Sequence, residues 1–332
     1  MPPSPSFSSS WTQFRPPKPT FTEKDLPDLR GKTYIVTGAN SGLGKEVARV
    51  LYSKNAKVYA AARFPEKADA AIEEIKKAAP DSAGELIFLH LDLADLNQVK
   101  TATQEFLSRE DRLHVLFNNA GVMGSDVKTP VRTAHGHEIT LGINCVGTLL
   151  FTQLLTPTLA VTAASSPPAS VRVVWLASFG VELYGEKDVG LPTDNLDYHR
   201  PVPGMDRYGL SKVGVWALGV EYARRHRADG IVSVPINPGN LRTELAREKT
   251  ALFRFLVTPI CYPPPMGAAT ELFAALSPDV TMEKSGSWVI PFGRFGNLRP
   301  DLLNAAKLED EGGTGGTAKF WEWTEEQIKE YL

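Results

Sequence analysis

Cysteine and net charge are both scarce in this sequence. Two cysteines, Cys145 and Cys261, occur in 332 residues. They are too few for a disulfide framework or a cysteine-based metal cluster, so we predict no metal site. Free thiols are typical of a reducing compartment, which indicates a cytoplasmic protein. The formal net charge is -2, and such a balance argues against nucleic acid as a partner.

A secretory signal is missing as well. The N-terminus MPPSPSFSSSWTQFRPPKPT has no apolar core of the kind that directs secretion. Its proline and serine content indicates an irregular extension, which we assign to residues 1–29. Trp11, Phe14 and Phe21 are the candidate anchors of this extension on the rest of the protein.

One long stretch lacks charge altogether. Residues 141–171 contain no Asp, Glu, Lys or Arg, and their length is sufficient to cross a bilayer. The stretch also includes Asn144, Gln153, Pro157 and several threonines, which argue against a membrane segment. The sequence therefore predicts a buried helix followed by a loop, with no transmembrane span.

Short apolar segments alternate with amphipathic helical patterns over most of the chain. This alternation is typical of a parallel sheet covered on both faces. No repeat and no linker divides the chain, so residues 30–332 are predicted to form one α/β domain. Strands are predicted at 33–38, 57–63, 85–93, 113–121, 171–178 and 231–239, and helices at 43–56, 66–79 and 96–110.

The loop TGANSGLG at 37–44 follows the first predicted strand. It does not match a P-loop, because Ala39 stands where that motif needs its first glycine and Glu46 where it needs a hydroxyl. The common dinucleotide spacing G-x-G-x-x-G is absent too. The loop still leads into a helix N-terminus, whose N–H groups and dipole suit a pyrophosphate. The alternative is a tight turn without a ligand. The residues predicted to bind are Gly38, Asn40, Ser41, Gly42, Leu43 and Gly44.

The end of the second predicted strand indicates which dinucleotide is bound. In NAD-binding folds an acidic residue about 20 positions after the glycines holds the ribose 2′-hydroxyl. Here the strand ends Ala61-Ala62-Arg63, with no acid. Arg63 can pair with a 2′-phosphate, so NADP(H) is the predicted cofactor. The alternative for Arg63 is an ordinary solvated surface side chain.

Further along, four residues have the chemistry of proton transfer. Tyr208 and Lys212 in YGLSK lie four positions apart, so they share one face of a predicted helix. An ammonium near a phenol lowers the phenol pKa, which suits proton exchange with an alcohol or ketone. Ser178 ends a predicted strand at the edge where ligands bind in such sheets. Asn144 is either a satisfied core amide or part of this site.

The motifs TG-x-x-x-G-x-G, Asp92, NNAG, Asn144, Ser178, Y-x-x-x-K and PG-x-x-x-T occur in this order. Together they resemble the short-chain dehydrogenase/reductase family over about residues 30–250. The resemblance implies a Rossmann-like, doubly wound, seven-stranded parallel sheet. It also implies a catalytic tetrad. Tyr208 would be the acid/base, and Ser178 would bind the substrate oxygen. Lys212 would bind the nicotinamide ribose and lower the Tyr208 pKa, and Asn144 would hold a relay water.

The same resemblance implies the rest of the cofactor site. The hydride chemistry belongs to the cofactor, while the protein supplies placement and electrostatics. The implied contacts are Asp92 and Leu93 at the adenine, Asn119, Ala120 and Gly121 along the cofactor, and Pro238, Gly239, Leu241 and Thr243 at the nicotinamide end.

The sequence departs from the family pattern in two places. The gap between Ser178 and Tyr208 is long, which is similar to the retinol-dehydrogenase-like branch. The chain also runs far past Thr243, and SGSWVIPFGRFG and FWEWTEEQIKEY resemble reductases of fungal secondary-metabolite pathways. Residues 244–285 are predicted to be a substrate lid, with plain packing or membrane-surface contact as alternatives. Residues 308–332 are predicted to form a loop and a final helix.

The function predicted from these features is an NADPH-dependent oxidoreductase. Its substrate would be a ketone, aldehyde or alcohol of a hydrophobic small molecule. The alternative is a cyclase, an isomerase or a cofactor-binding scaffold that has lost redox turnover, and the presence of Tyr208 and Lys212 argues against it. Family members often pair through the helices that carry Asn144 and Tyr208, so a homodimer is a candidate assembly unless the C-terminal extension covers that surface.

Overall fold

The computed structural model describes residues 7–124, 130–242 and 261–332. Its centre is an eight-stranded sheet with the order β3-β2-β1-β4-β5-β6-β7-β8. All neighbouring strands are parallel except β7 and β8. The predicted Rossmann-like α/β fold with seven parallel strands is confirmed, and β8 adds an antiparallel edge. The strands are β1 (Thr33–Thr37), β2 (Lys57–Ala62), β3 (Glu85–His90), β4 (Val115–Asn118), β5 (Arg172–Leu176), β6 (Val232–Ile236), β7 (Val289–Ile290) and β8 (Arg294–Phe295).

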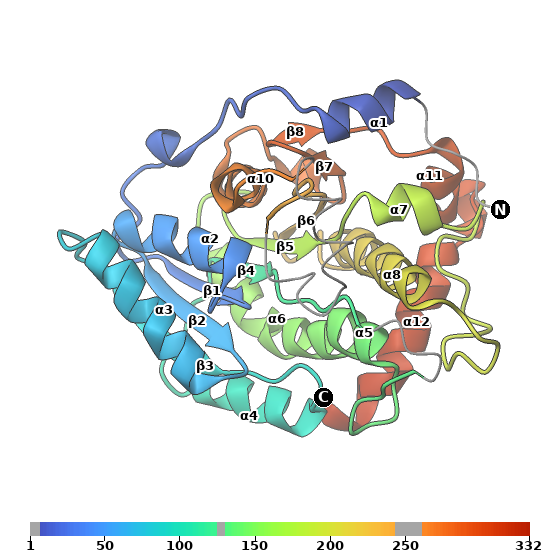
Figure 1. The fold of residues 1–332 in the computed structure, drawn as a ribbon, viewed down its shortest axis with the longest axis horizontal. Coiled ribbons are helices and arrows are strands. Elements are labelled where there is room, and N and C mark those ends of the chain that lie inside the picture. The colour runs from blue at the N-terminus through green and yellow to red at the C-terminus, as the bar shows by residue number, and fades with distance from the viewer. Residues whose placement is uncertain (1–6, 125–129, 243–260) are drawn as a thin grey trace.

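Helices cover both faces of the sheet (Figure 1). One apolar core lies between the sheet and α2, α3 and α10, and a second lies between the sheet and α4, α6 and α8. The helices are α1 (Phe7–Phe14), α2 (Gly42–Ser53), α3 (Pro65–Ala78), α4 (Leu96–Leu107), α5 (Ile139–Leu141), α6 (Thr148–Ala164), α7 (Gly180–Tyr184), α8 (Gly204–Arg225), α10 (Pro264–Leu276), α11 (Pro300–Ala306) and α12 (Gly316–Ile328).

Local sequence accounts for several of these elements. β1 is buried along its whole length, and β2 after its first residue, as expected for strands covered on both faces. Pro65 occupies the first turn of α3, where its missing N–H costs no helical hydrogen bond. Asp95 caps α4, because its carboxylate accepts the backbone N–H groups of Asn97 and Gln98.

The uncharged stretch forms a buried helix, as predicted. Among the described residues, one helix is long and apolar enough to cross a membrane, Ile139–Ala164, and 83% of its apolar window is buried inside the protein. Its middle, η2 (Gly142–Gly147), is π-helical and contains Asn144. Such π-helical turns are frequent at functional sites.

The C-terminal helix α12 lies along the outside of α8 and α6 (Figure 1). Phe320 and Trp321 on α12 are fully buried. The Thr317 hydroxyl donates a 2.8 Å hydrogen bond to Glu221 on α8. This chain therefore covers its own α6–α8 face, which a homodimer of the family type would use. The homodimer stays a prediction, and it would need a different face.

The sequence predicted an irregular N-terminal extension, and this is wrong for Phe7–Phe14, which form the helix α1. Proline and serine content is a weak guide here, since tertiary contacts stabilise short helices in proteins. Phe14 packs edge-on against Phe179, and Phe21 against Phe273, as candidate anchors should. Trp11 is 59% exposed.

The structure describes only part of the segment predicted as a lid. Residues 243–260 lie outside the described residues, and Thr243 with them. Residues 264–276 form α10, whose buried side chains pack in the core against α2 rather than over a substrate.

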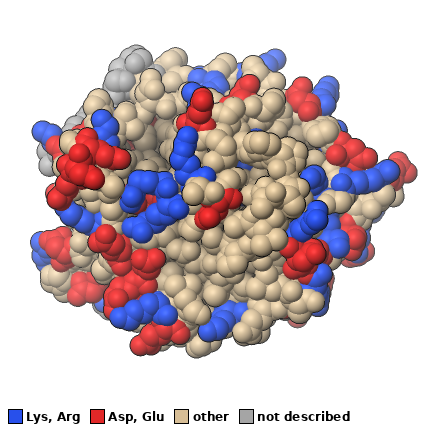
Figure 2. Space-filling view, turned by 180° about the vertical axis from the view of Figure 1, so that it is seen from behind, with Lys and Arg blue, Asp and Glu red and all other residues tan. Residues whose placement is uncertain are grey.

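Charged side chains of both signs are interspersed over the face of the molecule in Figure 2. No broad area of one sign is visible on the described part of that face. Binding to a polyanion such as nucleic acid needs a positive surface, so this face agrees with the charge balance of the sequence.

Candidate active site

A cavity of about 700 Å³ opens at the carboxyl ends of the parallel strands. In open α/β sheets this edge is where ligands bind. Asn144 is buried behind the cavity rather than lining it. The sequence-predicted residues that line it are Gly38, Asn40, Ser41, Gly42, Leu43, Gly44, Arg63, Asp92, Leu93, Asn119, Ala120, Gly121, Ser178, Tyr208, Lys212, Pro238, Gly239 and Leu241.

The glycine loop turns sharply from β1 into α2. Gly38 has a φ of 71°, in the left-handed region that side chains rarely adopt. At Gly44 the constraint is space, because a Cβ there would lie 2.4 Å from the Asn119 amide nitrogen and 2.7 Å from the Gly38 oxygen. The two glycines let the strand, the turn and the helix N-terminus pack closely at the cavity.

The N-terminus of α2 is open to a ligand. Ser41 is its N-cap, but the Ser41 side chain makes no capping hydrogen bond. The first N–H groups of the helix therefore remain available to an anion. Nearby, Asn119 donates a 2.7 Å hydrogen bond to the Thr37 oxygen, while its own side-chain oxygen is buried without a partner in the described structure. This glycine cradle with its unsatisfied polar groups fits a dinucleotide.

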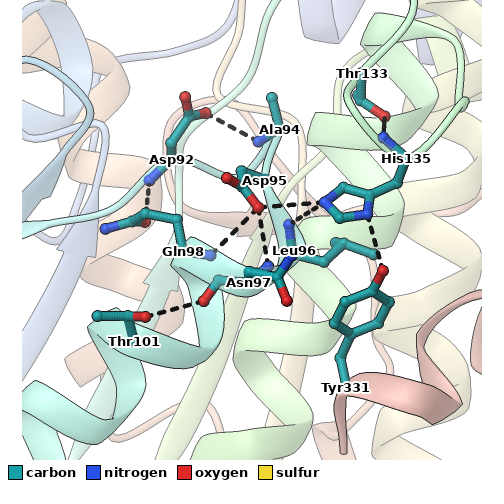
Figure 3. A network of polar contacts seen from close by, with 10 residues as sticks. All are labelled: Asp92, Ala94, Asp95, Leu96, Asn97, Gln98, Thr101, Thr133, His135 and Tyr331. Atoms are coloured by element: carbon teal, nitrogen blue, oxygen red, sulfur yellow. Dashed lines mark hydrogen bonds and ion pairs between the residues drawn. The ribbon is translucent and has the colours of Figure 1, made fainter.

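The part of the cavity next to Asp92 is held by a polar network (Figure 3). The Asp92 carboxylate accepts the Ala94 N–H at 2.9 Å, and the Asp92 N–H donates to Gln98 at 2.7 Å. His135 Nε2 accepts the Leu96 N–H at 3.0 Å. The same Nε2 lies 3.2 Å from Asp95 Oδ1, and the His135 Nδ1 lies 2.8 Å from the Tyr331 hydroxyl oxygen. The C-terminus of the chain is thereby tied to the loop that carries Asp92.

Two cations flank the rim at the end of β2. Arg63 is exposed, and its guanidinium lies 4.3 Å from the centre of the Phe64 ring. Lys67 lies in the first turn of α3, lines the same cavity, and has its Nζ 5.7 Å from that ring. The described residues offer Arg63 no carboxylate partner. Sequence reasoning missed Lys67, because Arg63 precedes the helix and no helical spacing relates the two residues.

Tyr208 and Lys212 share one face of α8, as predicted from their spacing. The Lys212 Nζ is 5.9 Å from the centre of the Tyr208 ring and donates to the Leu176 oxygen at 2.6 Å. Burial raises the pKa of Tyr208 above its ordinary value. Burial also lowers the pKa of Lys212 to about 8. Burial of the phenol and a nearby ammonium act on the Tyr208 pKa in opposite directions, and the lowering of this pKa by Lys212 stays a prediction.

Ser178 lies at the carboxyl end of β5 and lines the cavity. Its oxygen accepts the Gly180 N–H at 3.0 Å. That contact orients the hydroxyl oxygen and leaves its hydrogen free to donate to a ligand.

Asn144 has every side-chain polar group satisfied. Its oxygen accepts the Val122 N–H at 2.9 Å, and its nitrogen donates to the Val122 oxygen and to the Ser211 hydroxyl. A Cβ at Gly121 would lie 3.2 Å from both the Asn144 oxygen and the Lys212 Nζ. Asn144 therefore joins the Gly121 loop to the part of α8 that carries Lys212, and its role with a water remains a prediction.

The other end of the cavity is apolar, and sequence reasoning did not find it. Tyr184 packs its ring on α8 where Gly209 follows Tyr208, and a Cβ at Gly209 would lie 2.1 Å from that ring. No local sequence pattern marks this wall, because its residues come from segments far apart in the chain. The side chains concerned are Phe14, Val131, Phe179, Leu183, Tyr184 and Met205.

Comparisons with known proteins agree with this geometry. Residues 32–174 match the family model described as short chain dehydrogenase. The chain is 53% identical to the short-chain dehydrogenase/reductase bet4 of Neocamarosporium betae, over 98% of this chain and 94% of that protein. It is 52% identical to a short-chain dehydrogenase/reductase of Phomopsis amygdali, over 98% of each chain.

A solved structure of an uncharacterized protein from Mycobacterium paratuberculosis has a TM-score of 0.65 and 26% identity, over 93% of this chain and 97% of that one. The retinol-dehydrogenase-like branch is not distinguished by these similarities. Their high coverage and identity, together with the glycine turn and the Tyr208–Lys212 pair at one cavity, show that this chain belongs to the short-chain dehydrogenase/reductase family and is an oxidoreductase of CH–OH and C=O groups.

Proposed function

We propose that this protein is an NADPH-dependent reductase of a ketone or aldehyde on an apolar small molecule. The observation that carries the proposal is the meeting of Ser178, Tyr208 and Lys212 at one cavity. The glycine loop and α2 lie on one side of them, and an apolar wall lies on the other. A cofactor at the first end and a carbonyl at the second would meet beside the Tyr208 hydroxyl.

Tyr208 can serve as the proton donor of a reduction. A phenol has an ordinary pKa of ~10 and is protonated at neutral pH, so the Tyr208 hydroxyl can donate its proton to a carbonyl oxygen. Ser178 offers a second hydrogen bond to the same oxygen, which stabilises the negative charge that develops there. Lys212 brings a positive charge close to this pair and favours the phenolate left after donation.

The cofactor that the family uses is NAD(H) or NADP(H), and bound in this cleft it would supply the hydride. Preference for NADP(H) is part of the proposal. Two cations, Arg63 and Lys67, lie at the rim, and the end of β2, Ala61-Ala62-Arg63, has no acid to hold a ribose 2′-hydroxyl. A 2′-phosphate suits this charge better than a hydroxyl does.

The substrate we propose is a hydrophobic intermediate of fungal secondary metabolism. The apolar wall of the cavity supports a hydrophobic molecule, since such pockets bind ligands mainly through apolar area. The motifs SGSWVIPFGRFG and FWEWTEEQIKEY, and the fungal origin of the two relatives, support the biological setting.

Replacement of the proposed proton donor tests the function. We expect Tyr208→Phe to lower NADPH-dependent carbonyl turnover by about 10²- to 10⁴-fold, the usual contribution of a general acid. NADPH affinity, measured by fluorescence titration, should stay within about threefold, because one hydroxyl outside the phosphate site is removed. Tyr184→Phe is the matched control, since it removes another phenol from the same cavity.

Two outcomes would contradict the proposal. Unchanged turnover in Tyr208→Phe would remove Tyr208 from the chemistry. A wild-type protein that binds NADPH and oxidises none of it with any carbonyl would favour the cyclase, isomerase or scaffold alternative.

A further inference from the structure

We propose that the N-terminal helix α1 is a built part of the substrate site, and that Phe14 selects substrates with an apolar ring. The proposal rests on the reductase function proposed above. Phe14 lines the cavity, although it lies well before residue 32, where the family match begins. The element therefore lies outside the segment that the family model matches.

A buried polar junction fixes α1 in place. Gln13 is only 4% exposed. Its amide nitrogen donates to the Glu182 carboxylate at 2.6 Å, and its oxygen accepts the Asn237 amide at 2.9 Å. One side chain thus joins α1, α7 and the end of β6. A buried amide without hydrogen-bond partners is costly. These bonds therefore hold α1 in one position on the domain.

Further contacts hold the same helix from the other side. Arg294 on β8 donates to the Thr12 hydroxyl and to the Thr12 oxygen, both at 2.8 Å. The Tyr262 hydroxyl donates to the Phe14 oxygen at 3.3 Å. Segments from the C-terminal part of the chain therefore position the backbone next to Phe14, and Figure 1 shows α1 close to β8.

The residues next to these contacts place Phe14 at the substrate end. Its ring meets Phe179 edge-on, with centroids 4.9 Å apart, and Phe179 directly follows Ser178. Asn237, the partner of Gln13, directly precedes Pro238 in the loop assigned to the nicotinamide end. Phe14 thus stands beside the proposed reaction centre.

The two flanking aromatic residues of the extension behave differently. Trp11 is 59% exposed, and Phe21 packs on Phe273 of α10 with centroids 6.2 Å apart. Neither lines the cavity. Phe14 presents an aromatic ring to a space already bordered by Phe179 and Tyr184, and aromatic pairs add specific edge or stacked contacts beyond burial. A ring-bearing ketone fits this wall better than a short aliphatic one.

The test compares ketones of increasing ring size in wild type, Phe14→Ala and Phe14→Leu. Acetone, cyclohexanone, acetophenone and acetylnaphthalene are titrated onto the NADP⁺-bound protein, where no hydride is available, by calorimetry or thermal shift. We expect Phe14→Ala to weaken acetylnaphthalene binding by about tenfold, the effect of losing one aromatic contact. Phe14→Leu should retain cyclohexanone binding and lose the preference for the aryl ketones.

Phe21→Ala is the matched control, since it removes a phenylalanine of the same extension outside the cavity. It should leave every ketone affinity unchanged, and NADP⁺ affinity should match wild type in all variants. Equal aryl-ketone binding in wild type and Phe14→Ala would overturn the proposal. So would a wild type that binds none of the ketones. Ring-selective binding without NADPH-dependent turnover would leave the proposal standing and remove the reductase function instead.

Discussion

The two ends of the cleft are built in different ways. At the cofactor end, the turn from β1 into α2 and the end of β2 supply most of the wall from contiguous sequence. At the substrate end, Phe14, Phe179 and Met205 come from three segments that are far apart. The first end needs correct local geometry, whereas the second needs the whole chain to be folded.

The two departures from the family pattern, the long gap after Ser178 and the C-terminal extension, contact each other at the substrate end. The long insertion after Ser178 packs on the C-terminal extension, where Asn304 donates to the Asp188 carboxylate at 2.9 Å and Thr314 donates to the Asp188 oxygen. Arg299 joins α11 to the end of α7. The insertion and the extension are therefore one structural unit behind the apolar wall, with α1 added in front.

The largest difference between the substrate end and the cofactor end of the cleft is expected when the contacts of Arg299 are removed. Arg299 is 5% exposed and donates to the Glu182 oxygen at 2.5 Å and to the Gly185 oxygen at 2.9 Å. It also pairs with Asp301. Arg299→Met leaves these groups buried without their donor, so we expect a loss of about 3–5 kcal/mol in the free energy of unfolding, measured by denaturant titration.

The comparison adds a functional readout to this variant. Ketone affinity should fall, while NADPH affinity at temperatures below unfolding should stay near that of wild type. Lys319→Ala is the matched control, because it removes an exposed pair with Glu309 in the same extension and should cost under about 1 kcal/mol. Equal losses of ketone and NADPH affinity in Arg299→Met would show that the ends are not separate.

At the cofactor end, Arg63→Ala should have a smaller and selective effect. We expect NADPH affinity to fall by about tenfold, because the cation is exposed and partly screened by salt. NADH affinity, measured by the same fluorescence titration, should not change, and ketone affinity should not change either. Arg109→Ala removes a surface arginine paired with Glu105 elsewhere and serves as control. A parallel loss for both dinucleotides would exclude a 2′-phosphate role for Arg63.

A pH-dependent effect on stability is expected at Glu271. Glu271 on α10 is buried, and neither carboxylate oxygen has a partner in the described structure. Burial raises its pKa from 4.5 to about 8, partly offset by the charge of Lys212. The folded state therefore binds a proton more tightly than the unfolded state does, so the contribution of Glu271 to stability falls as pH rises from about 4.5 to about 8.

Glu271→Gln removes this titration while it keeps the shape of the side chain. The melting temperature of Glu271→Gln relative to wild type should rise between pH 5 and pH 8 and level off above that. Glu221→Gln is the contrasting control, since Glu221 is equally buried but bonded to Thr317 and Arg224, and its loss should destabilise the protein. A pH-independent difference for Glu271→Gln would contradict the burial effect on its pKa.

Sequence patterns sufficed for the cofactor end because its signals are local. The TGANSGLG loop specifies a turn that only glycines permit, and the spacing of Tyr208 and Lys212 specifies one helix face. Apolar runs such as KVYAAA predicted strands covered on both sides. The uncharged stretch was correctly interpreted as a buried helix, because its polar residues and prolines are unsuited to lipid.

Two other features were decided by tertiary structure. Phe7–Phe14 are helical because Gln13, Thr12 and Phe14 find partners more than 160 residues away in the chain, which no local pattern encodes. The pKa of Tyr208 follows from its burial, and burial is a property of the assembled fold.

By itself, the sequence determined the fold class, the order of the motifs, and the position of the functional residues at the carboxyl ends of parallel strands. These follow from periodicity and backbone geometry, which act over a few residues. Only the tertiary structure decided that α12 covers the α6–α8 face, and that α1 joins α7 and the end of β6 at the apolar wall. Such contacts depend on the burial of complementary surfaces from segments that are distant in the sequence. The free energy of this burial is gained only when the chain has folded and the segments are in contact.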